Sequence, residues 1–368
     1  RGLVFLKEAD RLQTERFFGL PCTTRTGMPE CSGDFLLITE RGRFEGARLV
    51  TKEYAAEETV VRVVRETPGA EYRVETVYRL DQETGVITRS DALTNQTGEA
   101  STIYACLPRL TLQGGQYELY AQASNWSKEN QGAWLPLSVG GVTLTNSAGR
   151  STESGTPFAC LRQMQTGIAV AIHVRPVGDW IIRVRRVAEG RATHYVLETG
   201  LSDQDLHMRI APGETIDLPE LLFLGFEGQV ERCGERWQRY LLNRYGLRTL
   251  PEMVYNTWFF EFDTLDIPRL QQQVLRAKEL GCRVFVVDAG WFGAGEDWSN
   301  QVGEWRECTT RAFRGRMREF ADFVRSNGMG FGLWMEPERA CQGTPVYVEH
   351  PDWFLEEDAI VFDLSNPA

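Results

Sequence analysis

Arg283-Val-Phe-Val-Val-Asp-Ala-Gly-Trp-Phe-Gly293 is a short apolar run that ends in a carboxylate and opens into a loop of glycine and aromatic residues. A continuous apolar run bounded by glycine is typical of a strand buried on both faces, as in parallel sheets. In barrels built from such sheets, ligands bind beyond the carboxyl ends of the strands. We therefore expect Asp288 to face a ligand site.

Strand–helix units surround this stretch. The predicted elements are strands over 254–260, 282–288 and 329–335 and helices over 266–280 and 311–327. Pro268 suits the first turn of the first helix, and Gly281 and Gly328 suit the helix ends. Such alternation is typical of right-handed βαβ units in a parallel sheet. The sequence thus predicts the first three units of a (β/α)8 TIM barrel, followed by a strand-like run over 359–364, whereas a closed barrel needs about eight units.

Before about residue 225, apolar residues recur with the two-residue period that is typical of strands. Apolar and polar residues alternate over 72–80, a turn-like segment follows at 81–85, and a second extended run starts at Val86, which together indicate a hairpin. Further strand-like runs lie at 101–112, 167–174, 180–187, 194–201 and 206–210. Many strands without long helices between them indicate an antiparallel β-sandwich.

A helical pattern separates the two regions. Five apolar or aromatic residues fall on one helical face, and Gly246 stands where a left-handed C-cap would lie; the five are Val230, Cys233, Trp237, Tyr240 and Leu241. We predict a multidomain chain with a β-sandwich domain over 1–227, a helical linker over 228–252 and a partial (β/α)8 barrel over 253–368.

Composition excludes several function classes. The 368 residues suit about two domains. A net charge of −11, without a block of lysine or arginine, argues against nucleic acid as a partner. The longest apolar stretch, 218–226, is much shorter than the roughly 20 residues that cross a bilayer, so no membrane partner is predicted.

Cysteine and histidine usage predicts neither a disulfide framework nor a metal site. The eight cysteines include no C-x-x-C pair, and the four histidines lack the spacing of metal ligands. Several of the thiols lie within apolar runs and suit small buried side chains in a reducing cytoplasm. The chain starts at Arg1 without methionine, which we interpret as a truncated start.

Polar and aromatic residues converge where the three barrel strands end. Carboxylates there are Glu261, Asp263, Asp288, Glu336 and Glu338. One such carboxylate is often only a helix cap or half of a loop ion pair. Tryptophan is frequent in the same region, and interleaved tryptophan and carboxylate suit a carbohydrate, which has apolar C–H faces and a hydroxyl rim. We expect core packing for Trp353 and a rim contact for Trp298.

Two interpretations of the carboxylates remain open from the residues alone. Asp288 and Glu336 can be the nucleophile and acid of a retaining glycosidase, provided that their carboxyl groups lie about 5–5.5 Å apart. Alternatively, either of them can hold a sugar hydroxyl.

Five ordered motifs resemble glycoside hydrolase family 36, the bacterial α-galactosidase family. They are Asn256-Thr-Trp258, Val287-Asp-Ala-Gly-Trp-Phe-Gly293, Gly332-Leu-Trp-Met-Glu-Pro-Glu338, His350-Pro-Asp-Trp353 and Phe362-Asp-Leu-Ser365. The front half is similar through Gly33-Asp-Phe35, Leu93-Thr-Asn95 and Asn125-Trp-Ser-Lys-Glu129, the last of which resembles the tryptophan-bearing loop of the family's β-supersandwich domain.

The resemblance implies a retaining hydrolase that releases terminal α-linked galactose from oligosaccharides or glycoconjugates. One aspartate attacks the anomeric carbon and another serves as acid and then base. The family's nucleophile lies in a Lys-x-Asp-x-Asn motif at the next strand, so both catalytic residues are expected beyond Ala368. We expect a fragment truncated at both ends and inactive alone, no cofactor or metal, and a possible homo-oligomer, a tetramer by resemblance.

The same resemblance implies roles for individual residues. Asp288 corresponds to the first carboxylate of the family's Asp-Asp-Gly-Trp motif and is expected to bind galactose hydroxyls. Trp258 and Trp334 match the tryptophans that wall the sugar subsite, and Trp291 and Trp126 complete the predicted substrate-binding set. Glu336 is expected to orient a loop rather than transfer a proton.

One position departs from the family pattern. Ala289 stands where the family usually has its second aspartate, so an acceptor for a sugar hydroxyl is missing. A charge-assisted hydrogen bond is worth about 1.5–3 kcal/mol, so its loss lowers affinity for plain galactose about ten- to a hundredfold. Two alternatives therefore stay open: an α-N-acetylgalactosaminidase and a non-catalytic carbohydrate-binding relative.

Overall fold

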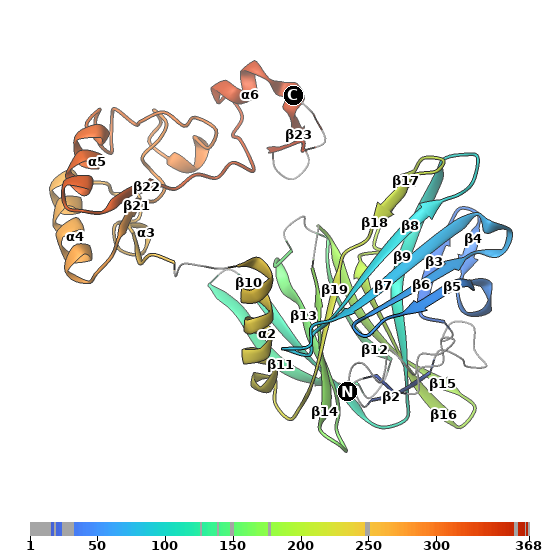
Figure 1. The fold of residues 1–368 in the computed structure, drawn as a ribbon. Coiled ribbons are helices and arrows are strands. Elements are labelled where there is room, and N and C mark those ends of the chain that lie inside the picture. Colours follow the sequence, from blue (N-terminus) through green and yellow to red (C-terminus); the bar gives the residue numbers. More distant parts are fainter. Residues whose placement is uncertain are drawn as a thin grey trace. The chain divides into compact units, whose positions relative to one another are not determined.

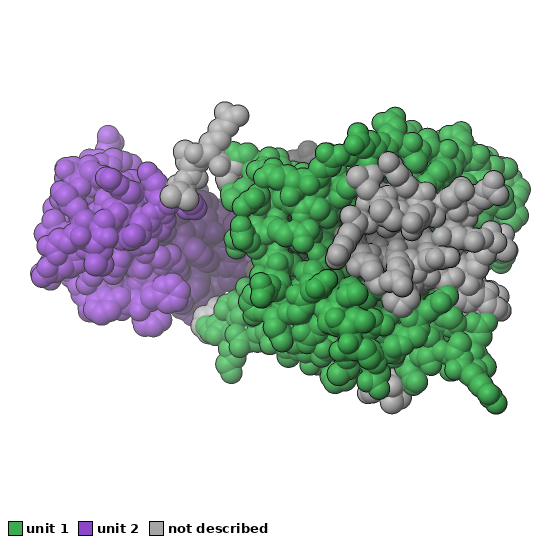
Figure 2. Space-filling model, turned by 60° about the horizontal axis from the view of Figure 1, so that its bottom comes forward, with its two compact units in different colours: residues 1–247 green, residues 248–368 purple. Residues whose placement is uncertain are grey.

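The structure is a computed structural model, and it divides the chain into two compact units, Arg1–Leu247 and Arg248–Ala368. Figure 2 distinguishes the two units by colour. The described residues are 16–17, 20–23, 33–125, 127–137, 140–147, 151–175, 178–246, 251–356, 360–364 and 366. None of the described helices is both long and apolar enough to cross a membrane.

The first unit is built from two antiparallel sheets (Figure 1). In its described part, nine strands form one sheet: β1 (Arg16–Phe17), β2 (Leu20–Thr23), β3 (Phe35–Thr39), β4 (Gly42–Phe44), β9 (Ser101–Gln113), β12 (Gly141–Asn146), β15 (Trp180–Glu189), β16 (Ala192–Leu201) and β17 (Met208–Ile210). Ten form the other: β5 (Val50–Ala56), β6 (Val60–Glu66), β7 (Tyr72–Leu80), β8 (Ile87–Asn95), β10 (Tyr117–Asn125), β11 (Lys128–Pro136), β13 (Ser154–Gln163), β14 (Ile168–Val174), β18 (Thr215–Asp217) and β19 (Leu221–Glu227).

The alternating pattern places residues from both sheets in a shared core. Trp180 and Leu197 from the first sheet belong to the same buried cluster as Tyr117 and Val170 from the second. The predicted hairpin is confirmed, because Tyr72 pairs with Asn95 and the strands remain in register to the turn. The predicted sandwich is confirmed as well.

Helix α2 (Glu231–Tyr245) belongs to the first unit. Cys233 and Tyr240 on its buried face pack with Cys160 and Leu224 of the ten-stranded sheet. Gly246 ends the helix with φ 62°, the left-handed conformation that glycine adopts without strain, as predicted. The helix that the sequence pattern places in a linker is therefore part of the sandwich body, which extends to Leu247.

The second unit contains a parallel sheet in the order β20–β21–β22. Its strands are β20 (Val254–Asn256), β21 (Val284–Val287) and β22 (Gly330–Leu333), and its longer helices are α4 (Ile267–Glu279) and α5 (Met317–Ser326). The two helices contact each other, and their apolar faces share a core with Phe285 of the central strand. This arrangement confirms the start of a (β/α)8 barrel.

Two predicted boundaries in this unit are wrong. The first strand ends at Asn256 rather than 260, because the Asn256 side chain accepts a hydrogen bond from the Trp258 N–H and starts helix α3 (Trp258–Glu261). The helix predicted from 311 begins at Met317, because Arg314 and Gly315 have positive φ values of 53° and 81° that a right-handed helix excludes.

The segment after β22 contains short elements in its described part. The helices described there are the five-residue α6 (Pro345–Glu349) and the 3-10 helix η6 (Pro351–Trp353). The strand-like run predicted over 359–364 contains β24 (Ile360–Phe362), which pairs antiparallel with β23 (Phe354–Glu356) rather than extending the parallel sheet. The described part of this unit therefore contains three parallel strands and a separate hairpin.

Candidate functional site

Asp288 lies directly after β21, and among the described residues every hydrogen bond to its carboxylate comes from an uncharged group. Its side chain is 9% exposed. The Asn256 amide donates to Oδ2 at 2.7 Å, and the Ala289 backbone N–H donates to Oδ1 at 2.8 Å. The Asp288 N–H itself donates to the Thr257 hydroxyl at 3.0 Å. Each carboxylate oxygen keeps further acceptor capacity, so the group is fixed in place and still able to bind hydroxyls.

Asn256 connects the ends of two neighbouring strands. Its amide nitrogen binds Asp288, while its Oδ1 accepts from the backbone N–H of Trp258 at 2.8 Å. Asn256 therefore positions both a predicted sugar-binding carboxylate and a predicted sugar-binding tryptophan. It was not predicted as a site residue, although its place at a strand end within the Asn256-Thr-Trp258 motif was a usable signal.

The predicted tryptophans Trp258 and Trp334 both contact a third indole, that of Trp298. The ring centroid of Trp298 is 5.8 Å from that of Trp258 and 5.9 Å from that of Trp334, with both pairs edge to face. All three rings are half-buried. Trp298, expected as a rim contact, thus joins the two tryptophans in one aromatic group.

Trp291 is placed differently from the other predicted tryptophans. It is 4% exposed, and its indole N–H donates to the backbone carbonyl of Trp334 at 2.8 Å. This bond ties the loop after β21 to the end of β22. Outside this group, Trp353 is half-buried and stacks on His350 at 3.8 Å.

The loop after Asp288 needs glycine at position 290. Gly290 has φ +95°, and a methyl group there would lie 3.0 Å from the Asp263 Cβ and 3.2 Å from its backbone Cα and O. The close approach brings the segment that follows α3 against the segment that follows β21. Ala289, between Asp288 and Gly290, is 1% exposed.

Glu336 makes an ion pair within its own loop. Its Oε1 accepts from Arg339 Nε at 2.7 Å, and this hydrogen bond raises the pKa of Arg339. The arginine also lies 3.5 Å from the thiol of Cys341, which donates to the carbonyl of Ser299. These contacts suit the predicted orienting role of Glu336 better than proton transfer.

Two further predictions concern what the described residues contain. Trp126 lies outside them, so its place relative to the strand ends stays a prediction. Within the described ranges, no group of three His, Cys, Asp or Glu side chains is arranged to hold a metal ion.

The fold defines a class: an N-terminal antiparallel β-sandwich followed by the strand–helix units of a (β/α)8 barrel. Residues 38–195 match the glycosyl hydrolase family 36 N-terminal domain, and residues 236–363 match Melibiase. The two matches together cover most of the chain. The chain belongs to glycoside hydrolase family 36.

Curated relatives match over both units. Alpha-galactosidase Mel36A of Lactobacillus acidophilus is 24% identical over 315 residues, which are 83% of this chain and 42% of that protein. Alpha-galactosidase 1 of Pediococcus pentosaceus is 23% identical over 321 residues, which are 84% of this chain and 43% of that protein. The chain thus spans less than half the length of these relatives.

Solved structures share the fold. The galactosidase domain of the α-galactosidase–sucrose kinase AgaSK superposes with a TM-score of 0.78 at 21% identity, covering 100% of this chain and 56% of that one. A variant of α-galactosidase AgaA from Geobacillus stearothermophilus, solved with raffinose, gives a TM-score of 0.75 at 20% identity and covers 91% of this chain and 51% of that one.

Proposed function

We propose that the full-length protein is a retaining α-galactosidase that releases terminal α-linked galactose from oligosaccharides or glycoconjugates. The observation that carries this proposal is Asp288, a buried carboxylate fixed by neutral donors at the end of a barrel strand in a family 36 chain. The names of the curated relatives, and the raffinose and stachyose complexes of AgaA variants, support the substrate class.

In this proposal the present chain supplies sugar binding. The Asp288 carboxylate accepts hydrogen bonds from galactose hydroxyls, and the half-buried rings of Trp258 and Trp334 stack on the apolar C–H face of the sugar. Trp291 holds the loop that carries Asp288, and Trp126 is proposed at the mouth of the pocket. The nucleophile and the acid/base are proposed in the sequence beyond Ala368.

Ala289 favours a second candidate, an α-N-acetylgalactosaminidase. A methyl group in place of a carboxylate removes an acceptor for a hydroxyl of plain galactose. The downstream sequence distinguishes an α-galactosidase or α-N-acetylgalactosaminidase from a non-catalytic relative. Only the two enzymes need the Lys-x-Asp-x-Asn motif and a second aspartate.

Kinetics of the full-length protein test the proposal. Hydrolysis of an aryl α-galactoside should exceed that of the matching α-N-acetylgalactosaminide. The opposite preference would assign the second candidate, and absence of both activities would leave carbohydrate binding without chemistry. We further propose a cytoplasmic homotetramer, which cell fractionation and light scattering would test.

A further inference from the structure

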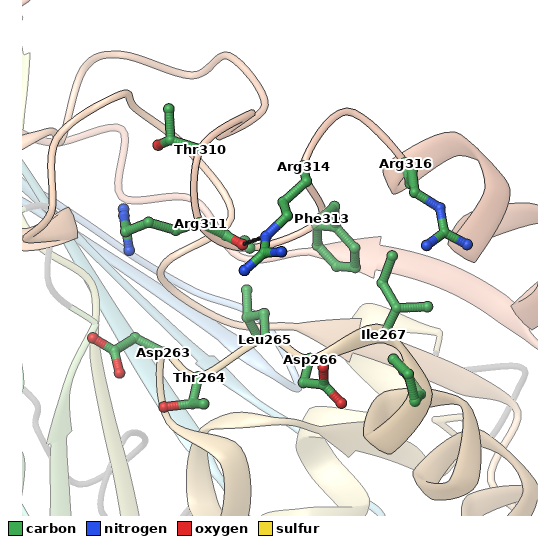
Figure 3. Close-up of a pocket in the computed structure, with 12 residues that line it drawn as sticks. Asp263, Thr264, Leu265, Asp266, Ile267, Thr310, Arg311, Phe313, Arg314 and Arg316 are labelled. Carbon is green, nitrogen blue, oxygen red and sulfur yellow. Dashed lines mark hydrogen bonds between the residues drawn. The ribbon is translucent and has the colours of Figure 1, made fainter.

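The loop that carries Trp298 is held by side chains from other segments of the second unit. On the amino-terminal side of this residue, Arg311 donates to the carbonyl of Gly295 at 2.7 Å. Arg311 also lines a pocket formed by the segments before helices α4 and α5 (Figure 3). Figure 3 shows carboxylates on one of these segments and arginines on the other, and Arg311 is an arginine that reaches back to the loop. The amino-terminal part of the loop is therefore fixed.

On the carboxyl-terminal side, Cys341 fixes the same loop at two points. Its thiol donates to the carbonyl of Ser299 at 3.2 Å, and its backbone N–H donates to the carbonyl of Val302 at 2.8 Å. Ser299 belongs to the short 3-10 helix η5 (Trp298–Asn300), so the first bond is made at the residue next to Trp298. Cys341 therefore connects the segment after β22 to the turn that carries Trp298.

Arg339 connects Cys341 to the end of β22. Its Nη1 donates to the Cys341 sulfur at 3.5 Å, and its Nε donates to Glu336 Oε1 at 2.7 Å. Glu336 follows Trp334 by two residues, so one guanidinium links the segment of Trp334 to the residue that holds the Trp298 turn. The planar, forked guanidinium binds two acceptors at fixed angles, which the single ammonium of a lysine does not do.

The backbone around Arg339 is fixed as well. Strand β24 binds it on both sides, because the Ala340 N–H donates to the Ile360 carbonyl and the Phe362 N–H donates to the Glu338 carbonyl, each at 3.1 Å. The Arg339 side chain itself is half-buried. Its guanidinium is therefore confined to one place, unlike that of an arginine in an exposed ion pair.

These contacts form a closed ring with the aromatic group at the strand ends. Trp298 contacts Trp334 at a centroid distance of 5.9 Å, and it also contacts Trp258. We propose that Arg339 is a positioning residue that fixes the spacing of Trp298 and Trp334. This spacing sets the aromatic wall against which galactose packs. The effect on sugar binding rests on the proposed function, whereas the effect on the indoles does not.

Kinetics and near-ultraviolet circular dichroism of the full-length protein test the inference. Arg339→Gln should raise KM for an aryl α-galactoside about three- to tenfold with little change in kcat, because binding is weakened equally in the ground state and the transition state. The circular dichroism of the contacting indoles should change as well. Arg276→Gln is the matched control, because Arg276 also pairs at 2.7 Å with a glutamate three residues away, Glu279, but at the exposed surface of α4. It should leave both readouts unchanged.

A double-mutant cycle with Trp298→Phe determines whether Arg339 acts through Trp298. In the Trp298→Phe background, Arg339→Gln should have no further effect on KM or on the spectrum. Cys341→Ser keeps an acceptor for the guanidinium and a donor for the Ser299 carbonyl, so it should resemble the wild type. Cys341→Ala removes both groups and should resemble Arg339→Gln.

The possible outcomes are distinct. An effect of Arg339→Gln no larger than that of Arg276→Gln, or additive effects of Arg339→Gln and Trp298→Phe, would overturn the positioning role. If the wild type hydrolyses no α-galactoside while Arg339→Gln changes the spectrum only when Trp298 is present, the proposed function fails and the positioning role stands. Hydrolysis by the wild type, with KM and spectrum unchanged in Arg339→Gln, gives the reverse result.

Discussion

In the first unit Glu198 is surrounded by arginines, whereas in the second unit Asp288 is held by neutral groups. Glu198 is 1% exposed and accepts from Arg109 at 2.7 Å, Arg183 at 2.9 Å and Arg185 at 3.2 Å. Burial alone would raise the pKa of Glu198, but the three guanidinium charges outweigh it and lower the pKa.

Asp288 is also buried, yet no arginine or lysine among the described residues forms an ion pair with it. Its donors are the Asn256 amide and the Ala289 N–H. A carboxylate neutralised by arginines has little left to offer a ligand, whereas one held by neutral donors keeps its charge for a ligand. The comparison separates a carboxylate that stabilises the fold from one that is available for binding.

The largest expected effect follows from replacing Asp288. Asp288→Asn in the full-length protein keeps the size of the side chain and removes its charge. We expect kcat/KM for an aryl α-galactoside to fall about a hundredfold or more, because two charge-assisted hydrogen bonds of about 1.5–3 kcal/mol each are weakened. The free energy of unfolding should fall by about 1–3 kcal/mol, because the asparagine amide oxygen can accept from only one of the two donors, the Asn256 amide and the Ala289 N–H. Unchanged kinetics would show that Asp288 does not hold the sugar.

The converse substitution is Glu198→Gln. It leaves three guanidinium groups facing a neutral side chain, which should lower the free energy of unfolding by about 3–5 kcal/mol. Urea denaturation measures the loss. Glu235→Gln is the matched control in the same unit, because Glu235 pairs with Arg239 at the surface and should lose far less. A loss no larger than the control's would mean that the arginine cluster does not stabilise the sandwich.

His173 in the first unit is a half-buried titratable group without an ion-pair partner among the described residues. Burial lowers the pKa of His173 to about 4, and its Nδ1 has no hydrogen-bond partner in the described chain. The unfolded chain, with a pKa near 6.5, binds the proton more readily. Stability should therefore fall between about pH 6.5 and pH 4, by on the order of 3 kcal/mol.

Denaturation of wild type and His173→Gln at pH 7 and pH 4.5 measures this contribution. As the pH falls, the wild type should lose more unfolding free energy than the variant, so the variant should become more stable relative to the wild type. A difference that is the same at both pH values would rule out His173 as the source of the pH dependence.

Local sequence signals predicted much of the fold. Helix α4 lies within the predicted range, with Asp266 as its cap, Pro268 in its first turn and Gly281 beyond its end. Boundaries failed where a side chain or a backbone angle decided them. The Asn256 side chain accepts a hydrogen bond from the backbone N–H two residues further on, and this bond ends the strand. The strand ends there although Phe259 and Phe260 have high strand propensity.

The site was less predictable than the fold. Asp288 could be selected because a strand-end carboxylate beside glycine is visible in one segment. The Asn256-Thr-Trp258 motif marked Asn256, but its bond to Asp288 was not visible in one segment, because the bond depends on the parallel register that pairs Asn256 with Val286. The burial of Trp291 and the bridging position of Trp298 likewise depend on contacts between segments.

The smallest expected effect concerns position 289. A substitution there tests whether a second carboxylate beside Asp288 improves sugar binding. We expect Ala289→Asp in the full-length protein to strengthen galactose binding about tenfold or more, because one charge-assisted hydrogen bond is gained. Ala289→Asn, of equal size without charge, should gain less. The Kd for galactose, measured by calorimetry, distinguishes them. Since Ala289 is 1% exposed in the described chain, an unchanged Kd with lowered stability would mean that this position packs against protein rather than sugar.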